Sequence, residues 1–142
     1  MMKTRLPHTL AVFVLVFIFG YPFDGQAADE AKSGVAAPET VCCTYQVKAG
    51  QEANFTALLS KSRTLYEKLG LVLPQPYLAT RESDGAGRVR FQEIFTWKSA
   101  DIPDNAPPEV AALWGELNDA CEARDGRPPI AIATVSIVGA RY

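Results

Sequence analysis

Histidine is almost absent from this sequence of 142 residues: His8 is its only histidine. This residue lies in an N-terminal segment that we expect to be removed, so the remaining chain carries no imidazole. The absence excludes Ser-His-Asp and Cys-His catalytic groups, histidine-ligated haem and ordinary histidine zinc sites from that part of the chain. We expect neither a metal ion nor a cofactor.

The sequence also lacks a run of basic residues. It has 14 Lys and Arg against 16 Asp and Glu, which gives a formal net charge of −2. Proteins that bind nucleic acid usually gather positive charge on one face or along one helix. Nucleic acid is therefore not an expected partner.

Long hydrophobic runs are missing too, since the apolar run from Leu10 to Phe19 is only about half of the roughly 20 residues that span a bilayer. Lys3 and Arg5 precede this run, and the small residues Gly25 and Ala27 follow it. This order is typical of a secretory signal peptide. We expect residues 1–27 to be removed and the protein to be exported, periplasmic or secreted, and free of the membrane. The alternative is an N-terminal anchor that is not cleaved.

The remaining chain divides into a short lead-in and one domain. Residues 28–39 are rich in alanine, glycine and acidic residues without periodicity, which predicts a flexible segment. Residues 40–142 can form one modest core, small enough for oligomerisation to contribute to its stability.

Hydrophobic periodicity in the domain predicts strands and helices in alternation. Helices are indicated by apolar residues three and four apart, and strands by β-branched and aromatic residues. Gly70 and Gly126 are expected to end the two helices. Residues 71–76 are expected to connect the first helix to the next strand. The predicted order is strand 41–47, helix 51–69, strand 77–82, strand 88–98, helix 108–126 and strand 130–138. This is the order of an α+β domain with a four-stranded antiparallel sheet and two helices on one face.

The last predicted strand, residues 130–138, is apolar at almost every position. Such a strand is expected to be covered on both faces. Two helices cover only one face of the sheet. Leaving the apolar side chains of the other face exposed to water costs several kcal/mol, at roughly 25 cal/mol per Å² of apolar surface. We therefore predict a homodimer in which a second subunit covers the open face.

Four stretches of the chain are similar to those of a known family: residues 45–52, 91–99, 108–114 and 122–128. They resemble the dimeric α/β-barrel superfamily, whose subunits have the ferredoxin-like β-α-β-β-α-β fold. The likeness is strongest to small antibiotic-biosynthesis-monooxygenase-like proteins of unknown function. It implies that two sheets pack face to face and that a ligand cavity lies between sheet and helices or inside the barrel.

One departure from this superfamily concerns catalysis. Relatives often place a histidine at the start of the second helix, where this chain has Ala106-Pro107-Pro108. The superfamily includes cofactor-free monooxygenases, haem enzymes and isomerases, but a role that depends on that histidine is not expected here.

Glu93 is the candidate catalytic residue. Alternation along residues 88–98 places this carboxylate on an apolar and aromatic face, where it could act as a base or orient a ligand hydroxyl. The alternative is a structural acid paired with Arg81 or Arg90 across the hairpin. The residues that share its face are Val89, Phe91, Phe95 and Trp97.

A ligand pocket is predicted near this strand. Tyr45, Arg81, Phe95 and Trp97 are the candidate ligand-binding residues, suited to a flat apolar molecule. The alternative assigns Tyr45 and Trp97 to the core or the dimer interface, and Trp114 is expected in the core.

Three cysteines remain, an odd number for an exported chain. Cys42 and Cys43 are predicted on opposite faces of the first strand, with Cys121 near the far end of the second helix. A separation on the order of 15–20 Å predicts no Cys43–Cys121 disulfide. Both residues are expected to be small buried hydrophobes, the alternative being a reactive thiol.

Two functional hypotheses remain, and they leave open whether the chain is an enzyme. In the first, an exported dimer binds a small apolar or aromatic ligand without catalysis. In the second, a cofactor-free monooxygenase acts on an aromatic or polyketide-like compound, a hypothesis that rests on analogy of fold.

Overall fold

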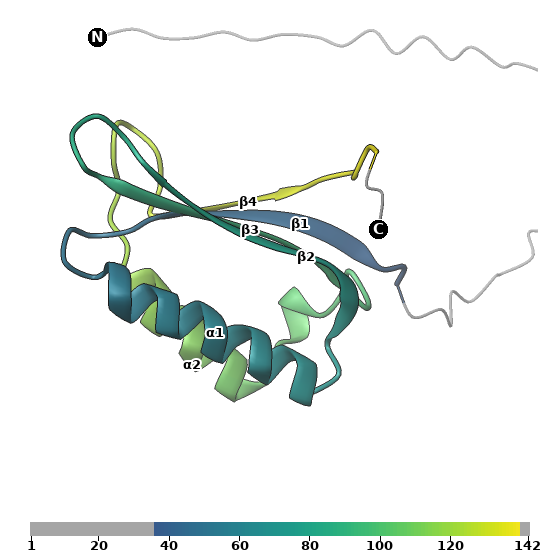
Figure 1. The fold of residues 1–142 in the computed structure, drawn as a ribbon. Helices are drawn as coiled ribbons and strands as arrows, with labels where there is room; N and C mark the ends of the chain where they lie inside the picture. The colour runs from purple at the N-terminus through teal and green to yellow at the C-terminus, as the bar shows by residue number, and fades with distance from the viewer. Residues whose placement is uncertain (1–35, 140–142) are drawn as a thin grey trace, which may run out of the picture. The chain divides into compact units, whose positions relative to one another are not determined.

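The computed structural model describes residues 36–139, so the predicted signal peptide and most of the predicted lead-in lie outside the described residues. Four strands form one antiparallel sheet in the order β2-β3-β1-β4. Both helices lie on one face of this sheet, and no helix among residues 36–139 covers the other (Figure 1). The α+β prediction is confirmed. In chain order the elements are β1 (Glu39–Gln46), α1 (Glu52–Lys68), β2 (Val72–Ser83), β3 (Val89–Trp97), the 3-10 turn η1 (Pro103–Asn105), α2 (Pro108–Asp119) and β4 (Ile130–Thr134).

Helix α1 forms where the sequence predicts it. Glu52 in its first turn and Lys68 in its last complement the helix dipole. Gly70 follows at φ 67°, a backbone conformation that glycine adopts at little cost. The helix buries one side against the sheet, through Phe55, Leu58, Leu59, Ser62, Arg63 and Tyr66.

Strand β2 begins earlier than predicted. The segment expected as a connection, residues 71–76, contains its first residues, because Val72 already pairs with Trp97 of β3. The register then shifts before Tyr77 resumes pairing with Phe95. Pro74 and Pro76 lie in this interval, and proline donates no hydrogen bond to a strand ladder.

Helix α2 starts at Pro108 as predicted but ends at Asp119, well before Gly126. The chain beyond it bonds to the end of the sheet instead: Lys48 donates its backbone N–H to Ala120 O at 3.0 Å, and Glu122 donates to Gln46 O at 2.9 Å. Cys121 therefore lies outside the helix, opposite Val47 in an isolated bridge.

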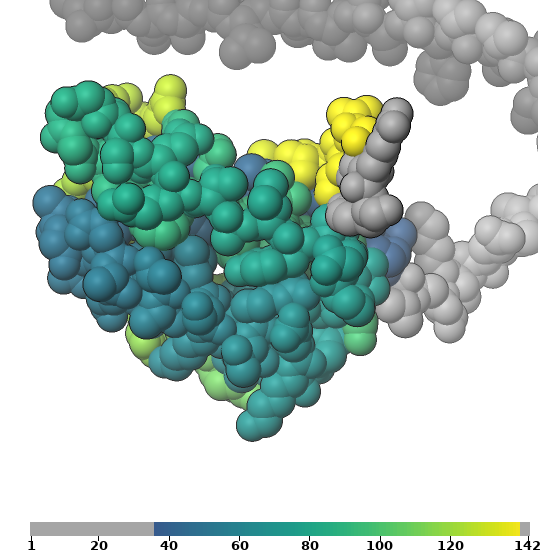
Figure 2. Space-filling view, viewed as in Figure 1, coloured from purple at the N-terminus to yellow at the C-terminus, as the bar shows by residue number. Residues whose placement is uncertain are grey.

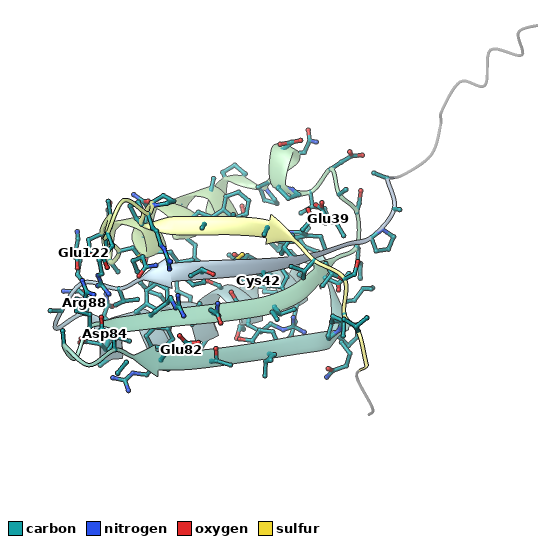
Figure 3. The ribbon with its side chains drawn as sticks, turned by 90° about the horizontal axis from the view of Figure 1, so that it is seen from above. Glu39, Cys42, Glu82, Asp84, Arg88 and Glu122 are labelled. Atoms are coloured by element: carbon teal, nitrogen blue, oxygen red, sulfur yellow. The ribbon has the colours of Figure 1, made fainter. Side chains whose placement is uncertain are left out.

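The expectation that the helices cover one face of β4 is wrong, since most of this strand is exposed in the single chain, whereas cover of the open face by a second subunit stays a prediction. Strand β4 ends at Thr134, not at Val138, and the helices do not reach across it. Ile132 is 69% exposed although register places it on the helix face beside the buried Cys43. The sheet seen from its open side carries Cys42 on β1 and Glu82 on β2 (Figure 3).

The core lies between the sheet and the helices. Burial alternates along β3, with Val89, Phe91, Glu93, Phe95 and Trp97 buried on the helix face, as the sequence predicted. No helix among the described residues is long and apolar enough to cross a membrane.

Candidate functional site

A cavity of about 500 Å³ lies between α2 and the half of the sheet formed by β1 and β4. Cys43 and Ile132, neighbours in the register of β1 and β4, contribute to one wall, and Leu117 and Asn118 of α2 contribute to the other. Val41, Pro103 and Ile130 add to the apolar lining, and five aromatic side chains also belong to it: Tyr45, Tyr66, Phe95, Trp97 and Trp114.

The aromatic residues pack on one another in tilted and edge-to-face pairs. The ring centroids of Phe95 and Trp97 are 4.8 Å apart, those of Tyr66 and Trp97 5.0 Å, and those of Trp97 and Trp114 6.3 Å. Trp114 Nε1 donates to the Tyr66 hydroxyl at 2.7 Å. These contacts fix the cavity wall in one arrangement and leave ring faces and edges for a flat ligand.

Few polar groups reach the cavity. Tyr45 is one of the lining residues that carry a polar group, and Glu39 and Thr134, which also line the cavity, are linked by a 2.7 Å hydrogen bond from Thr134 Oγ1 to Glu39 Oε1. Asn118 of α2 is a fourth polar contributor. A mostly apolar cavity with a small number of polar groups is the usual form of a small-molecule site.

Glu93 does not line the cavity, and only 1% of it is exposed. Tyr45, which does line the cavity, donates its hydroxyl hydrogen to Glu93 Oε2 at 3.1 Å. Burial raises the pKa of Glu93, whereas the Tyr45 hydroxyl, Tyr77 and the Arg63 guanidinium lower it. The carboxyl is thus a stronger base than an exposed glutamate, and it is connected to the cavity through Tyr45.

Burial also raises the pKa values of neighbouring groups. That of Tyr45 lies well above its ordinary value, and the nearby Cys43 and Glu93 add to the effect. The pKa of the Cys43 thiol rises to about 12, mainly through burial. Both side chains are therefore neutral at ordinary pH, and Cys43 is an unreactive thiol rather than a thiolate.

The structure brings together three of the four predicted ligand-binding residues. Tyr45, Phe95 and Trp97 line the cavity. Arg81 does not: it is exposed near the hairpin end of β2, opposite Phe91. The alternative that pairs Glu93 with Arg81 or Arg90 is wrong, because the partner found is Tyr45, and Arg90 pairs with Glu82 on the open face.

Sequence reasoning missed two groups around Glu93 and several in the cavity, among them Tyr66. Trp114, which was expected in the core, lines the cavity as well. Tyr66 and Arg63 follow Leu59 at helical spacings on the buried side of α1, a signal that the apolar pattern alone did not give. Tyr77 was placed on its strand but not assigned to the site. Among the described residues no group of three or more metal-ligating side chains occurs.

The cysteines have free thiols. Cys121 lies opposite Val47 at the end of β1, four residues beyond Cys43, which places the two sulfurs about 13 Å apart along the strand at 3.3 Å per residue. This separation is shorter than the roughly 15–20 Å expected from the sequence but is still too long for a disulfide, and the prediction of no Cys43–Cys121 bond remains for a measurement in solution.

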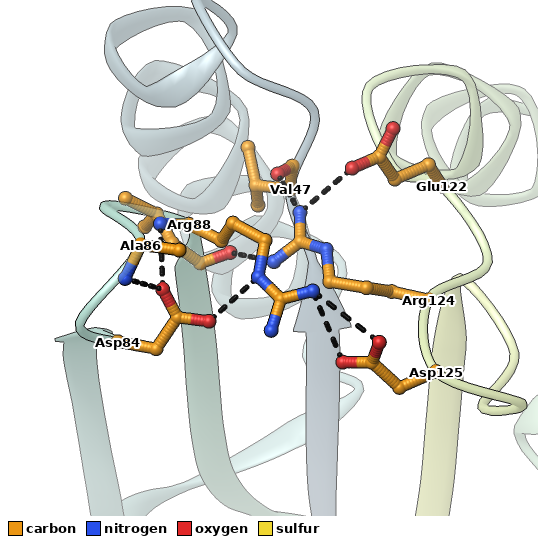
Figure 4. A network of polar contacts seen from close by, with 8 residues as sticks. Val47, Asp84, Ala86, Arg88, Glu122, Arg124 and Asp125 are labelled. Carbon is orange, nitrogen blue, oxygen red and sulfur yellow. Dashed lines mark hydrogen bonds and ion pairs between the residues drawn. The ribbon is translucent and has the colours of Figure 1, made fainter.

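A second group of charged residues joins the β2–β3 loop to the segment before β4 (Figure 4). Arg88 pairs with Asp84 and Asp125, while Arg124 donates to Val47 O at 2.7 Å and to Val89 O at 3.2 Å. Arg124 thereby ties the ends of β1 and β3 together. We regard this network as structural.

The sequence matches no protein-family model and no curated protein sequence. Solved structures with a similar fold do occur. A mutant form of SnoaB from Streptomyces nogalater, a cofactor-independent oxygenase, superposes with a TM-score of 0.54 at 13% identity, over 74% of this chain and 97% of that one.

Two further structures are similar to a comparable degree. A dimeric ferredoxin-like protein of unknown function from Jannaschia sp. gives a TM-score of 0.53 at 12% identity, over 71% of this chain and 100% of that one. A protein from Bordetella bronchiseptica, provisionally named an antibiotic biosynthesis monooxygenase, gives 0.52 at 12% identity, over 72% and 98%. The chain has the ferredoxin-like fold. At these identities the likeness shows the fold alone.

Proposed function

We propose that this chain is an exported protein that binds a small aromatic or otherwise apolar molecule in the cavity between β1, β4 and α2. The observation that carries the proposal is the cavity itself: about 500 Å³, with five aromatic side chains in its lining. Ligand sites in proteins are typically about 300–1,000 Å³ and mostly apolar. Export rests on the signal-peptide pattern of residues 1–27.

The few polar groups suggest which apolar molecules fit best. A planar ring can stack beside Trp97 and Trp114, and a ring hydroxyl can reach the Tyr45 oxygen. Tyr45 already donates its hydrogen to Glu93, so its oxygen is free to accept one from the ligand. A hydroxylated aromatic is therefore preferred over a hydrocarbon.

The protein acts as a homodimer in this proposal, with the open sheet faces packed together. The open face carries apolar side chains, including Leu78, which is 54% exposed, and the half-buried Ile94. The half-buried Thr40 also lies on this face, where its hydroxyl bonds to that of the buried Thr96 at 2.7 Å. Such a mixed surface is common at the interfaces of dimers.

Isothermal titration calorimetry with 2-naphthol tests the binding proposal. We expect one molecule bound per chain, and loss of binding in Leu117→Trp, which fills the cavity from α2. Ala111→Trp, on the exposed side of the same helix, is the matched control and retains binding. Equal binding by both variants rejects the cavity as the site.

A second candidate function is cofactor-independent oxygenation of such an aromatic. The Tyr45–Glu93 pair favours it, together with the fold shared with SnoaB. A phenolic substrate can give its proton to the Tyr45 oxygen while Tyr45 passes its own proton to Glu93. The resulting phenolate is electron-rich enough to react with dioxygen, which is the oxidant. Glu93 acts as the base through Tyr45.

Oxygen uptake with 1,8-dihydroxyanthrone tests this second function. Its acidic CH₂ group is oxidised to a carbonyl while one oxygen atom of O₂ leaves as water. We expect uptake to fall at least tenfold in Glu93→Gln, with 2-naphthol binding retained, and in Tyr45→Phe, where 2-naphthol binding also weakens because the oxygen that accepts from the ligand hydroxyl is lost. Unchanged oxygen uptake in Glu93→Gln rejects the role of this carboxylate as the base. If the wild type binds the aromatic but takes up no oxygen, oxygenation is rejected and ligand binding is the function that remains.

A further inference from the structure

Glu93 has a second side that faces away from the ligand cavity. The cavity lies toward β4, at one edge of the sheet, whereas β2 forms the other edge. Glu93 stands on β3 between them, directly opposite Ala79 of β2 and Cys43 of β1. Arg63 of α1 and Tyr77 of β2 act on Glu93 from this second side, and neither lines the cavity.

Arg63 is held in place by several contacts. Its Nε donates to Glu67 Oε1 at 2.5 Å, and its Nη2 reaches Leu73 O at 3.3 Å and Pro74 O at 3.2 Å. Its guanidinium carbon lies 4.5 Å from the centre of the Tyr77 ring, a cation–π distance. These contacts leave Nη1 buried without a hydrogen-bond partner among the described residues.

Glu93 leaves a matching acceptor. Tyr45 bonds to Oε2, and Oε1 is buried without a hydrogen-bond partner among the same residues. Only 1% of Glu93 and 9% of Arg63 are exposed. Leaving a buried charged donor or acceptor without a hydrogen bond destabilises the folded protein. One water molecule can form hydrogen bonds to both atoms at once.

No other cation among the described residues faces Glu93 from the elements packed against it. Strand β1 contributes Cys43 and Tyr45, β2 contributes Tyr77, and α1 contributes Tyr66 and Arg63. Glu67, an acid nearby, is paired with Arg63. In the space-filling view a small gap separates α1 from the strand above it on this face of the molecule (Figure 2).

We propose that Arg63 and Tyr77 form a second entrance to Glu93, at the β2 edge, where one water molecule joins Glu93 Oε1 to Arg63 Nη1 and exchanges the Glu93 proton with solvent. In the outward step Glu93 gives its proton to this water, which releases one to the solvent. The carboxylate that remains is held by Arg63 and Tyr45. Arg63 and Tyr77 are positioning residues, since neither touches the ligand cavity.

This arrangement separates the path of the proton from the path of the ligand. A ligand that fills the cavity covers Tyr45 from the β4 side but leaves the β2 side open. If the oxygenation proposed above occurs, Glu93 can be reset between turnovers without the product having to leave first. The route itself belongs to the folded protein and is tested without any ligand, so it can fail or hold independently of the proposed function.

Infrared titration of the Glu93 carboxyl band tests the inference. The band is identified as the one missing from Glu93→Gln. We expect Arg63→Gln to raise the titration midpoint of Glu93 by about one pH unit or more, the size of effect that a nearby opposite charge has. Arg63→Lys keeps most of the wild-type midpoint, and Tyr77→Phe raises it by a smaller amount. Arg90→Gln, an arginine on the open face of β3, is the control and leaves it unchanged.

A crystal structure that shows ordered water provides the second measurement. We expect one water within hydrogen-bond distance of both Glu93 Oε1 and Arg63 Nη1. A midpoint that stays at its wild-type value in both Arg63→Gln and Tyr77→Phe overturns the role of these residues. Direct contact between the two side chains, with no water, overturns the route. If Arg63→Gln does not fold, Tyr77→Phe and the crystal structure still decide.

Discussion

Tyr45 and Glu93 are joined by a buried hydrogen bond of 3.1 Å that crosses from β1 to β3. The two residues are diagonal neighbours, because Glu93 pairs in register with Cys43 and Tyr45 pairs with Phe91. Tyr45 lines the cavity and Glu93 does not. This single bond connects the only deeply buried carboxylate among the described residues to the site where a ligand is proposed to bind.

The energy of that bond is measurable by a double-mutant cycle. Tyr45→Phe removes the donor and leaves a carboxylate oxygen buried without a partner, so we expect a loss of about 1–3 kcal/mol in the free energy of unfolding. In the Glu93→Gln background the same change costs less, since the acceptor is neutral. Urea unfolding of the four proteins gives the coupling. Strictly additive effects would mean that the two side chains do not interact in solution.

Burial of Glu93 also predicts how stability depends on pH. Its pKa is raised above 4.5 in the folded state, so the folded protein binds this proton more tightly than the unfolded chain does. At a pH below the pKa of Glu93 in the unfolded chain, Glu93 does not lower the stability. As the pH rises from that value through the pKa of Glu93 in the folded protein, the stability falls. Glu93→Gln removes the loss, which amounts to about 1.4 kcal/mol for each unit by which the pKa is raised.

Unfolding of the wild type and Glu93→Gln across this pH range checks the sign. The difference in favour of the variant should grow from the acid end of the range toward neutral pH. A difference that shrinks toward neutral pH would show that the folded pKa lies below the ordinary one. Glu109→Gln, an exposed acid in the first turn of α2, serves as a control for loss of a carboxylate.

The polar network around Arg124 is predicted to stabilise the fold rather than to bind a ligand. Arg124 has a side chain only 10% exposed and bonds to the carbonyls of Val47 and Val89. Arg124→Leu leaves both carbonyls without this donor, and we expect a loss of about 2–3 kcal/mol, the scale of hydrogen bonds to a charged group. Thermal unfolding measures it. Arg127→Leu, exposed in the same segment, should change stability by less than about 0.5 kcal/mol.

The open sheet face is predicted to form the dimer interface. Ile94→Lys places a charge among Cys42, Leu78 and their neighbours on that face, where it would be buried by a second subunit. We expect the wild type to have twice the mass of one chain by light scattering at micromolar concentration, and the variant the mass of one chain. Ala111→Lys on α2 should remain a dimer. A wild type that is monomeric under these conditions contradicts the interface.

The fold was predicted well because the hydrophobic periodicity of the sequence indicates which segments form strands and which form helices. Alternation along β3 correctly places Phe95, Trp97 and Glu93 on one face, and the spacing of apolar residues locates α1 to within a residue at each end. Errors arise where tertiary contacts compete with local pattern. The chain leaves helix α2 early because Cys121 pairs with Val47 at the end of β1. Strand β2 begins before its two prolines because Val72 pairs with Trp97.

The site was harder to predict than the fold. Tyr45, Phe95 and Trp97 were identified because aromatics on a buried strand face are few. Arg81 was misplaced because alternation gives the face of a strand but not how far a helix extends along it. Arg63 was missed because a buried arginine interrupts an apolar helical pattern, and its partners on β2 are distant in sequence.

A crystal structure of the protein with 2-naphthol tests the central claim most directly. The account predicts ring density in the cavity beside Trp97 and Trp114, with the ligand hydroxyl bonded to the Tyr45 oxygen and the Tyr45–Glu93 bond intact. Density on the open sheet face, or a cavity without ligand at saturating concentration, would contradict it.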